Sequence, residues 1–278
     1  MEIGIFAKTF ARPNVEAVFE AVKDHGLNCV QFNFACAGLP SMPEQIDPAI
    51  VKRIASAAEK KGVTISVVSG TFNMAHPNAA VRDDGLRRLR ALASVCSDLG
   101  TAIITLCTGT RDPEDMWRYH PDNSEREAWD DLVVSMSEAL RIADEHAVTL
   151  GIEPEVNNVV DSARKARRLL DDMQSMRLKL VMDPANLFHP GELTHMREVF
   201  DAAFGLLGND IVIAHAKDLA ENRNGIQHVA AGQGRLDYAY YMQLLREMRF
   251  RGPVILHGLS ESEVAGSVAF LRGKLDRN

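Results

Sequence analysis

Four short apolar runs in the second half of the chain each lead to a residue that can bind a metal ion. These residues are Glu153, Asp183, His215 and His257. They follow one another at intervals of 30, 32 and 42 residues, which suits one repeating structural unit. One potential ligand at the end of each of four successive buried strands is typical of a metal site on a (β/α)8 barrel.

Two carboxylates and two imidazoles favour particular metals. This set suits Mn²⁺, Zn²⁺, Co²⁺ or Fe²⁺ better than Ca²⁺, which prefers ligand sets made only of oxygen. Taken alone, Glu153 is more typical of a solvated loop charge, and a single histidine after an apolar run is more typical of a structural residue. Four such residues in consecutive units indicate a metal site.

Residues close to these ligands are candidates for contacting a substrate. Side chains two apart on a strand point the same way, so Glu155 and Lys217 share the faces of Glu153 and His215. Lys217 could stabilise negative charge on a substrate, and an ion pair with Asp218 is an equally good interpretation.

Loops at the expected barrel mouth supply four further candidates for substrate binding. Asn186 and His189 follow Asp183 closely, although His189 also suits a purely structural loop role. Trp117 lies in a long loop after the fourth expected strand, where it could hold the C–H face of a sugar or anchor the loop. His76, in the loop after the third, is a weaker candidate.

Strands and helices that would position these residues alternate along the whole chain. Such alternation calls for a parallel sheet in an α/β protein, and eight units in 278 residues favour a closed (β/α)8 TIM barrel, a single domain over 1–278. A capping box is expected at Ser124, where the helix that reaches about His146 would begin. The expected strands are 2–6, 29–32, 64–68, 102–106, 148–153, 178–183, 211–214 and 253–256.

Composition excludes several classes of protein. A net charge of −7 argues against nucleic acid as the main partner, because phosphate binding needs a basic surface. Four cysteines without metal-ligand spacing indicate buried, reduced thiols and a cytoplasmic protein. No apolar run approaches the roughly 18 residues of a membrane span. The pair Gly232 and Gly234 does not fit a dinucleotide motif and is expected in a loop after the seventh strand.

Four motifs resemble the xylose isomerase-like barrel superfamily, in its sugar (phosphate) isomerase/epimerase group. The resemblance covers nearly the whole chain and implies one divalent ion, Mn²⁺, Mg²⁺, Co²⁺ or Zn²⁺. It implies that Glu153, Asp183 and His215 are ligands, and it leaves room for a homo-oligomer. The motifs are Gly151-Ile-Glu-Pro-Glu155, Val181-Met-Asp-Pro-Ala-Asn186, Ala214-His-Ala-Lys-Asp218 and Gly232-Gln-Gly-Arg-Leu-Asp237.

The eighth strand departs from the family pattern. The family's second glutamate, a ligand and a proton-transfer group, is His257 here. A histidine can bind a metal and accept a proton near neutral pH, but it supplies no anionic oxygen. Glu261 could compensate from the loop, yet it better fits the first turn of the last helix, after Ser260 as its cap.

The resulting hypothesis is a metal-dependent isomerase or epimerase of a small sugar, a polyol or its phosphate, acting through an enediolate held by the metal. Glu153 and His257 would move protons on opposite faces of the substrate, while Lys217 orients it. A keto-polyol (inosose-type) dehydratase would share the metal and the base. A non-catalytic sugar-binding barrel is an alternative from another class. An endonuclease of the superfamily would need three zinc ions, with more ligands than the sequence offers, and a basic groove.

Overall fold

Short, buried, β-branched runs form the barrel wall. The structure is a computed structural model that describes residues 1–189, 191–222 and 225–275. Pairing runs from β6 through β5, β4, β3, β2 and β1 to β9 and β7, and β6 then pairs with β7 to close a parallel eight-stranded barrel. The barrel strands are β1 (Glu2–Phe6), β2 (Cys29–Phe32), β3 (Thr64–Ser69), β4 (Ile103–Cys107), β5 (Thr149–Glu153), β6 (Leu178–Met182), β7 (Ile211–Asn222) and β9 (Pro253–Leu256).

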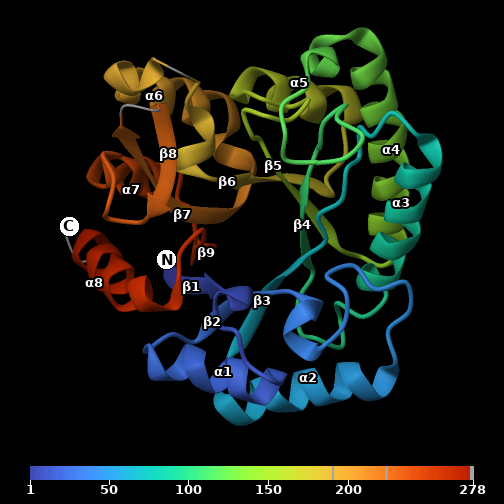
Figure 1. Cartoon of the computed structure of the whole chain (residues 1–278), viewed down its shortest axis with the longest axis vertical. Helices are drawn as coiled ribbons and strands as arrows, with labels where there is room; N and C mark the ends of the chain where they lie inside the picture. The colour runs from blue at the N-terminus through green and yellow to red at the C-terminus, as the bar shows by residue number, and fades with distance from the viewer. Residues whose placement is uncertain (190, 223–224, 276–278) are drawn as a thin grey trace.

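In the described part of the chain, eight α-helices surround the strands (Figure 1), so the chain is a (β/α)8 TIM barrel, as expected. Polar side chains begin several of them: the Asn14 side chain accepts a hydrogen bond from Ala17 N, and that of Asp47 accepts one from Ala49 N. The helices are α1 (Val15–Asp24), α2 (Pro48–Lys61), α3 (Ala79–Ala93), α4 (Arg126–Glu145), α5 (Ala163–Met173), α6 (Met196–Leu207), α7 (Tyr238–Glu247) and α8 (Val264–Leu275).

Two local expectations are wrong. The seventh strand does not end at residue 214 but continues to Asn222, and it forms an antiparallel hairpin with an additional strand, β8 (Gly225–Ala230). The expected capping box at Ser124 is absent, because the Ser124 hydroxyl donates to Pro121 O within a short 3-10 turn. Helix α4 begins only at Arg126, after Glu125, which makes no side-chain cap.

Small and branched side chains fill the barrel interior away from the site. Cys29, Val67, Val181, Ile213 and Ile255 form one buried cluster there. The room for it comes partly from Gly4, since a Cβ at that position would lie 2.6 Å from Ile255 Cδ1 and 2.8 Å from Cys29 Sγ. The interior is therefore a packed floor beneath the carboxyl ends of the strands.

The four cysteines are free and buried, as expected. Burial raises the pKa of the Cys29 thiol to about 11. Among the described residues, no helix is both long and apolar enough to cross a membrane.

Candidate metal centre and active site

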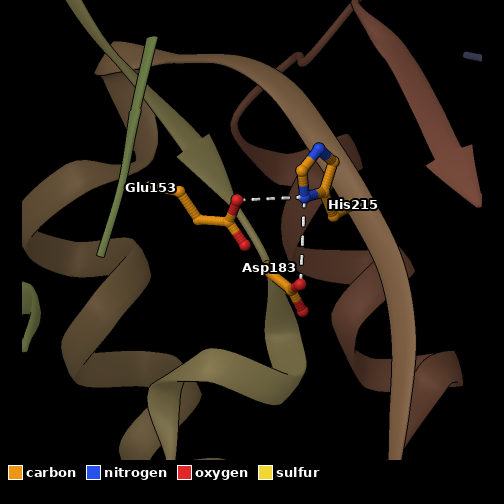
Figure 2. A group of neighbouring side chains, drawn as sticks. All are labelled: Glu153, Asp183 and His215. Carbon is orange, nitrogen blue, oxygen red and sulfur yellow. Dashed lines mark ion pairs between the residues drawn. The ribbon is translucent and has the colours of Figure 1, made fainter. Parts of the chain in front are cut away.

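Three of the four predicted ligands come together where β5, β6 and β7 open into the barrel mouth. Glu153 is the last residue of β5, Asp183 directly follows β6, and His215 lies in β7. Their side chains point toward one another (Figure 2), and one ligand atom of each lies within 4.8 Å of the others. Spacing of this order allows a single cation to contact all three residues.

The orientation of His215 is set from the opposite side of the barrel. Its Nε2 lies 2.9 Å from Oε1 of Gln31, whose Nε2 in turn donates to Thr105 Oγ1 at 3.3 Å. Because the amide oxygen of Gln31 faces the ring, His215 Nε2–H donates a hydrogen bond to it. Nδ1 then faces Glu153 Oε2 at 3.4 Å and Asp183 Oδ2 at 3.8 Å. A histidine ligand is normally held in this way by a partner on its other ring nitrogen.

Gln31 was not among the predicted site residues. It lies in the short strand β2, in which all four residues are buried. A long polar side chain in such a strand was the signal that could have indicated it, because a buried amide must find hydrogen-bond partners.

Burial and charge act against each other on these groups. Burial disfavours ionisation of Asp183, but Lys217 and His215 outweigh it and hold the pKa of this carboxyl well below its usual range. Burial likewise lowers the pKa of His215, but Glu153 and Asp183 outweigh it and raise that pKa to about 9. The carboxylate pair therefore attracts positive charge to the position of His215 Nδ1.

Lys217 belongs to the same network. Its Nζ lies 3.1 Å from Asp183 Oδ2 and donates to Asn186 Oδ1 at 3.0 Å. The amide nitrogen of Asn186 donates to Glu153 Oε1 at 2.7 Å. Asn186 thus links the ammonium group of Lys217 to the carboxylate of Glu153, and the two residues fix the positions of two candidate ligands.

Of the two interpretations of Lys217, the ion pair with Asp218 is wrong, because Lys217 pairs with Asp183 instead. Adjacent residues on a strand point to opposite faces, so Asp218 turns away from the site. Its carboxylate accepts hydrogen bonds from the backbone nitrogens of Leu219, Gly232 and Leu236. Asp218 therefore organises the loop that contains Gly232 and Gly234, which does follow the β7–β8 hairpin.

The donor set fits a divalent metal ion. His215 Nδ1 is a buried atom without a hydrogen-bond partner among the described residues, and Asp183 Oδ2 makes ion pairs only, with Lys217 at 3.1 Å and His215 at 3.8 Å. Unsatisfied buried polar atoms are costly, and a cation between them would remove that cost. Two carboxylates and one imidazole also leave coordination positions open, as catalytic metal sites require.

His257 lies beside this group rather than within it. It follows β9, and its ring stacks on His215 at 5.0 Å between centroids and on Phe6 at 5.3 Å. Burial, followed by the charge of His215, lowers the pKa of His257 to about 4. A neutral imidazole therefore stands where the family resemblance led us to expect a glutamate.

A cavity of about 540 Å³ opens above these residues. Glu153, Asn186, His215, Lys217 and His257 line it, and so do two more of the predicted substrate contacts. These two are Glu155, whose pKa is raised to about 7 by burial and then by Glu153, and Trp117 in the long loop after β4. The structure adds residues that were not predicted, namely Phe6, Lys8, Gln31, Asn33, Ser41, Ser69, Thr71, Thr105, Leu106, Cys107, Met116 and His228.

Residues 19–273 match the family model described as the xylose isomerase-like TIM barrel. The chain belongs to this family. The resemblance carried by the four sequence motifs is thereby confirmed. No curated protein matches this sequence.

Solved structures of other xylose isomerase-like barrels superpose on nearly the whole chain. A D-tagatose 3-epimerase-like protein aligns with a TM-score of 0.77 at 17% identity, covering 99% of this chain and 97% of that one. The probable 3-DHS dehydratase AsbF of Bacillus anthracis, involved in petrobactin synthesis, gives 0.76 at 15% identity over 100% of both chains. The IOLI protein, solved with a zinc atom, gives 0.75 at 15% identity over 100% and 99%. Identities this low show the shared fold.

Within this family barrel, two predicted substrate contacts lie away from the cavity. The His76 ring bonds to Pro113 O at 3.2 Å and accepts from Asn78 N at 3.0 Å, so it ties two loops together. His189 exchanges hydrogen bonds with Glu192 through its backbone. Neither histidine is among the described residues that line the cavity.

Glu261 has the role expected at a helix start. Ser260 and Glu263 form a capping box that leads into α8. The Glu261 carboxylate pairs with both terminal nitrogens of Arg12, at 2.9 and 2.5 Å. Glu261 therefore does not compensate for the missing eighth-strand carboxylate.

Proposed function

We propose that this chain is a divalent-metal-dependent isomerase or epimerase of a small sugar, a polyol or its phosphate. The observation that carries the proposal is the convergence of Glu153, Asp183 and His215, whose Nδ1 has no hydrogen-bond partner among the described residues, at the base of a cavity. Membership of the xylose isomerase-like family and the zinc atom in the IOLI structure support it. Mn²⁺, Mg²⁺, Zn²⁺ and Co²⁺ are all compatible with oxygen-rich ligands and one imidazole.

The residues around the cavity have distinct roles in this proposal. A divalent ion bound there would act as a Lewis acid toward a substrate carbonyl and so acidify the neighbouring C–H. Glu153 would accept or return that proton, with its carboxylate held by Asn186. His257, on the cavity wall beside His215, would transfer a proton on the other face of the substrate. The ammonium group of Lys217 would stabilise negative charge that develops on the substrate oxygens.

The test combines metal analysis of the purified protein with deuterium incorporation from D₂O into candidate ketoses. We expect about one equivalent of a divalent metal, and exchange at the carbon next to the carbonyl. Glu153→Gln should slow exchange by about 10²–10⁴-fold, the usual contribution of a positioned base. Glu261→Gln is the matched control, because this glutamate pairs with Arg12 and does not line the cavity. Unchanged exchange in Glu153→Gln would show that Glu153 is not the base.

A dehydratase is the second candidate, and the neutral His257 favours it. The family resemblance implies that two carboxylates transfer the protons, one on each face of the substrate. In this chain the neutral imidazole of His257 takes the place of the second carboxylate. Loss of water from a keto-polyol would use the same metal and a single residue, which takes the proton from the C–H bond and gives it to the departing hydroxide. A product lighter than the substrate by the mass of one water molecule would identify this activity. Sugar binding without exchange at any metal loading would instead identify a non-catalytic barrel.

A further inference from the structure

Apart from the proposed metal ion, the side chains that line the cavity offer little positive charge to an anionic substrate. No arginine occurs among the described residues that line it, and its two lysines are Lys8 and Lys217. Lys217 already forms an ion pair with Asp183 and donates a hydrogen bond to Asn186. Glu153 and Glu155 line the same cavity and would repel an anion. Lys8 is exposed on the short turn after β1.

In the region that follows β7, the backbone N–H groups that could bind a phosphate already donate to a carboxylate of the protein. Phosphates on TIM barrels commonly bind at the loops after the seventh and eighth strands. In this chain both carboxylate oxygens of Asp218 accept the backbone N–H groups of that region, from Gly232 at 3.1 Å and from Leu236 at 3.0 Å. The carboxylate fits so closely that a Cβ on Gly234 would lie 2.3 Å from its Oδ1.

At the helix start that follows the last barrel strand, β9, the backbone N–H groups are also bound by side chains of the protein. The N-terminus of a helix can hold a phosphate through its free N–H groups. Here Glu263 folds back onto the backbone nitrogen of Ser260 at 2.8 Å, and the Ser260 side chain caps the first turn. Two carboxylates of the chain, those of Asp218 and Glu263, thus take the positions that a phosphate would need.

The opposite wall of the cavity is rich in neutral hydrogen-bonding groups. Asn33, Ser69, Thr71 and Thr105 come from β3, β4 and the ends of β2 and β3. Hydroxyl and amide groups both donate and accept hydrogen bonds, as the hydroxyls of a sugar do. Trp117, half-exposed at the mouth, adds an apolar ring for C–H groups.

From this charge distribution we propose that the substrate is an uncharged, unphosphorylated polyhydroxy carbonyl compound. Its carbonyl end lies at Glu153 and His215, and its hydroxyl tail lies along the wall that contains Thr71. This inference rests on the proposed function and narrows it, because it excludes sugar phosphates and sugar acids as the preferred substrates.

The test is calorimetric titration of the full chain loaded with Mn²⁺. Each ligand pair is a free ketose and its phosphate ester: D-fructose with D-fructose 6-phosphate, and D-ribulose with D-ribulose 5-phosphate. We expect the free sugar of at least one pair to bind at least tenfold more tightly than its ester. Thr71→Val keeps the side-chain shape but removes the hydroxyl, so it should weaken binding of the free sugar about threefold to tenfold. Thr64→Val is the matched control, because Thr64 is exposed at the start of β3 and is not among the described residues that line the cavity, and it should change that affinity less than twofold.

The outcomes separate this inference from the proposed function. Tighter binding of a phosphate ester, lost in Lys8→Ala, would overturn the neutral substrate but keep the sugar-converting activity. Deuterium exchange into the ester faster than into the free sugar would do the same. Failure of every free and phosphorylated sugar to bind the Mn²⁺-loaded protein would overturn both. An unchanged unfolding temperature in Thr71→Val shows that its effect on binding does not arise from misfolding.

Discussion

Gln31 sets the role of His215, because its carbonyl oxygen holds the imidazole so that Nδ1 faces the two carboxylates. Gln31→Leu should therefore weaken metal binding about 10–100-fold, the usual cost of losing the partner of a histidine ligand. Calorimetric titration of the metal-free protein with Zn²⁺ or Mn²⁺ measures this. Gln31→Glu keeps the acceptor and should retain most of the affinity. Equal affinities in Gln31→Leu and the wild type would contradict this role.

Lys217 is the counter-ion of a buried carboxylate. Lys217→Met removes the nearest counter-ion of the buried Asp183, so the free energy of unfolding of the metal-free protein should fall by about 3–5 kcal/mol. Added Mn²⁺ should then raise the unfolding temperature more in Lys217→Met than in the wild type, because the ion becomes the partner of Asp183. Urea denaturation and thermal unfolding measure the two effects.

Lys179→Met is the matched control for this variant. Lys179 pairs with Asp210 at 2.6 Å, but the pair is partly exposed, so its loss should cost only about 0–1 kcal/mol. The response of Lys179→Met to Mn²⁺ should equal that of the wild type. If Mn²⁺ raises the unfolding temperature of Lys217→Met no more than that of Lys179→Met, Lys217 does not compete with the metal for Asp183.

At the residue scale the sequence predicts the types of the ligands better than their partners. Glu153, Asp183 and His215 could be predicted because the carboxyl ends of parallel strands meet at one end of a barrel. Gln31 is 184 residues from His215, and no local pattern connects the two. The sequence left two interpretations of Lys217 open, and the face that the strand imposes excludes the ion pair with Asp218, because neighbours on a strand point to opposite sides.

Among the elements, the connection between β4 and α4 depends on two asparagine side chains, the buried Asn123 and the half-buried Asn157. Asn123 Oδ1 accepts from the Thr110 hydroxyl at 2.9 Å and from Arg111 N at 2.7 Å, and its Nδ2 donates to Asn157 O. The Asn157 side chain then holds the backbone of Trp117 at the cavity mouth. The position of Trp117 therefore depends on a residue that does not line the cavity.

Asn123→Ala leaves these groups unsatisfied and should lower the free energy of unfolding by about 1–3 kcal/mol. It should also make the fluorescence of Trp117 more accessible to a soluble quencher, measured in a Trp129→Phe background. Glu125→Ala, an exposed position just beyond the same turn, should change stability by less than about 0.5 kcal/mol. Equal quenching in Asn123→Ala and Glu125→Ala would refute the positioning of Trp117 by Asn123.

The β7–β8 hairpin is the element that sequence reasoning missed. The apolar run ends at Ala214, and the residues after it include Lys217, Asp218 and Glu221, which lack the alternation of a half-buried strand. The backbone pairing of Lys217 with Ala230 through to Asn222 with Gly225 forms the hairpin instead. For this reason the cavity residue His228, carried on β8, could not be assigned to the site beforehand.

For the whole molecule, packing of the barrel interior depends on the room left by Gly4. Gly4→Ala would place a methyl group 2.6 Å from Ile255 Cδ1 and 2.9 Å from the backbone oxygen of Cys29, so it should destabilise the fold by about 1–3 kcal/mol. Gly266→Ala is the control, because this helical glycine has open space around it and should stabilise by about 0.5–1 kcal/mol. Urea denaturation compares the two, and a neutral Gly4→Ala would show that the interior repacks freely.

The alternating pattern made the eight-stranded barrel predictable, because each apolar run marks a wall strand whether or not its neighbours are known. Contacts that join distant parts of the chain were not predictable in this way. Gly4 illustrates this, since its sequence neighbours do not show that Ile255 and Cys29 will pack against it.

The two halves of the barrel contribute differently to the site, and this has an evolutionary consequence. The converging ligands Glu153, Asp183 and His215 belong to β5–β7 and their ends, whereas the neutral wall with Thr71 belongs to β2–β4 and their ends. In the proposed sugar-converting enzyme, mutations in the first half would change which sugar fits, while an unchanged second half would keep the metal ligands. Gln31 is the exception: a descendant that lost it would alter both at once.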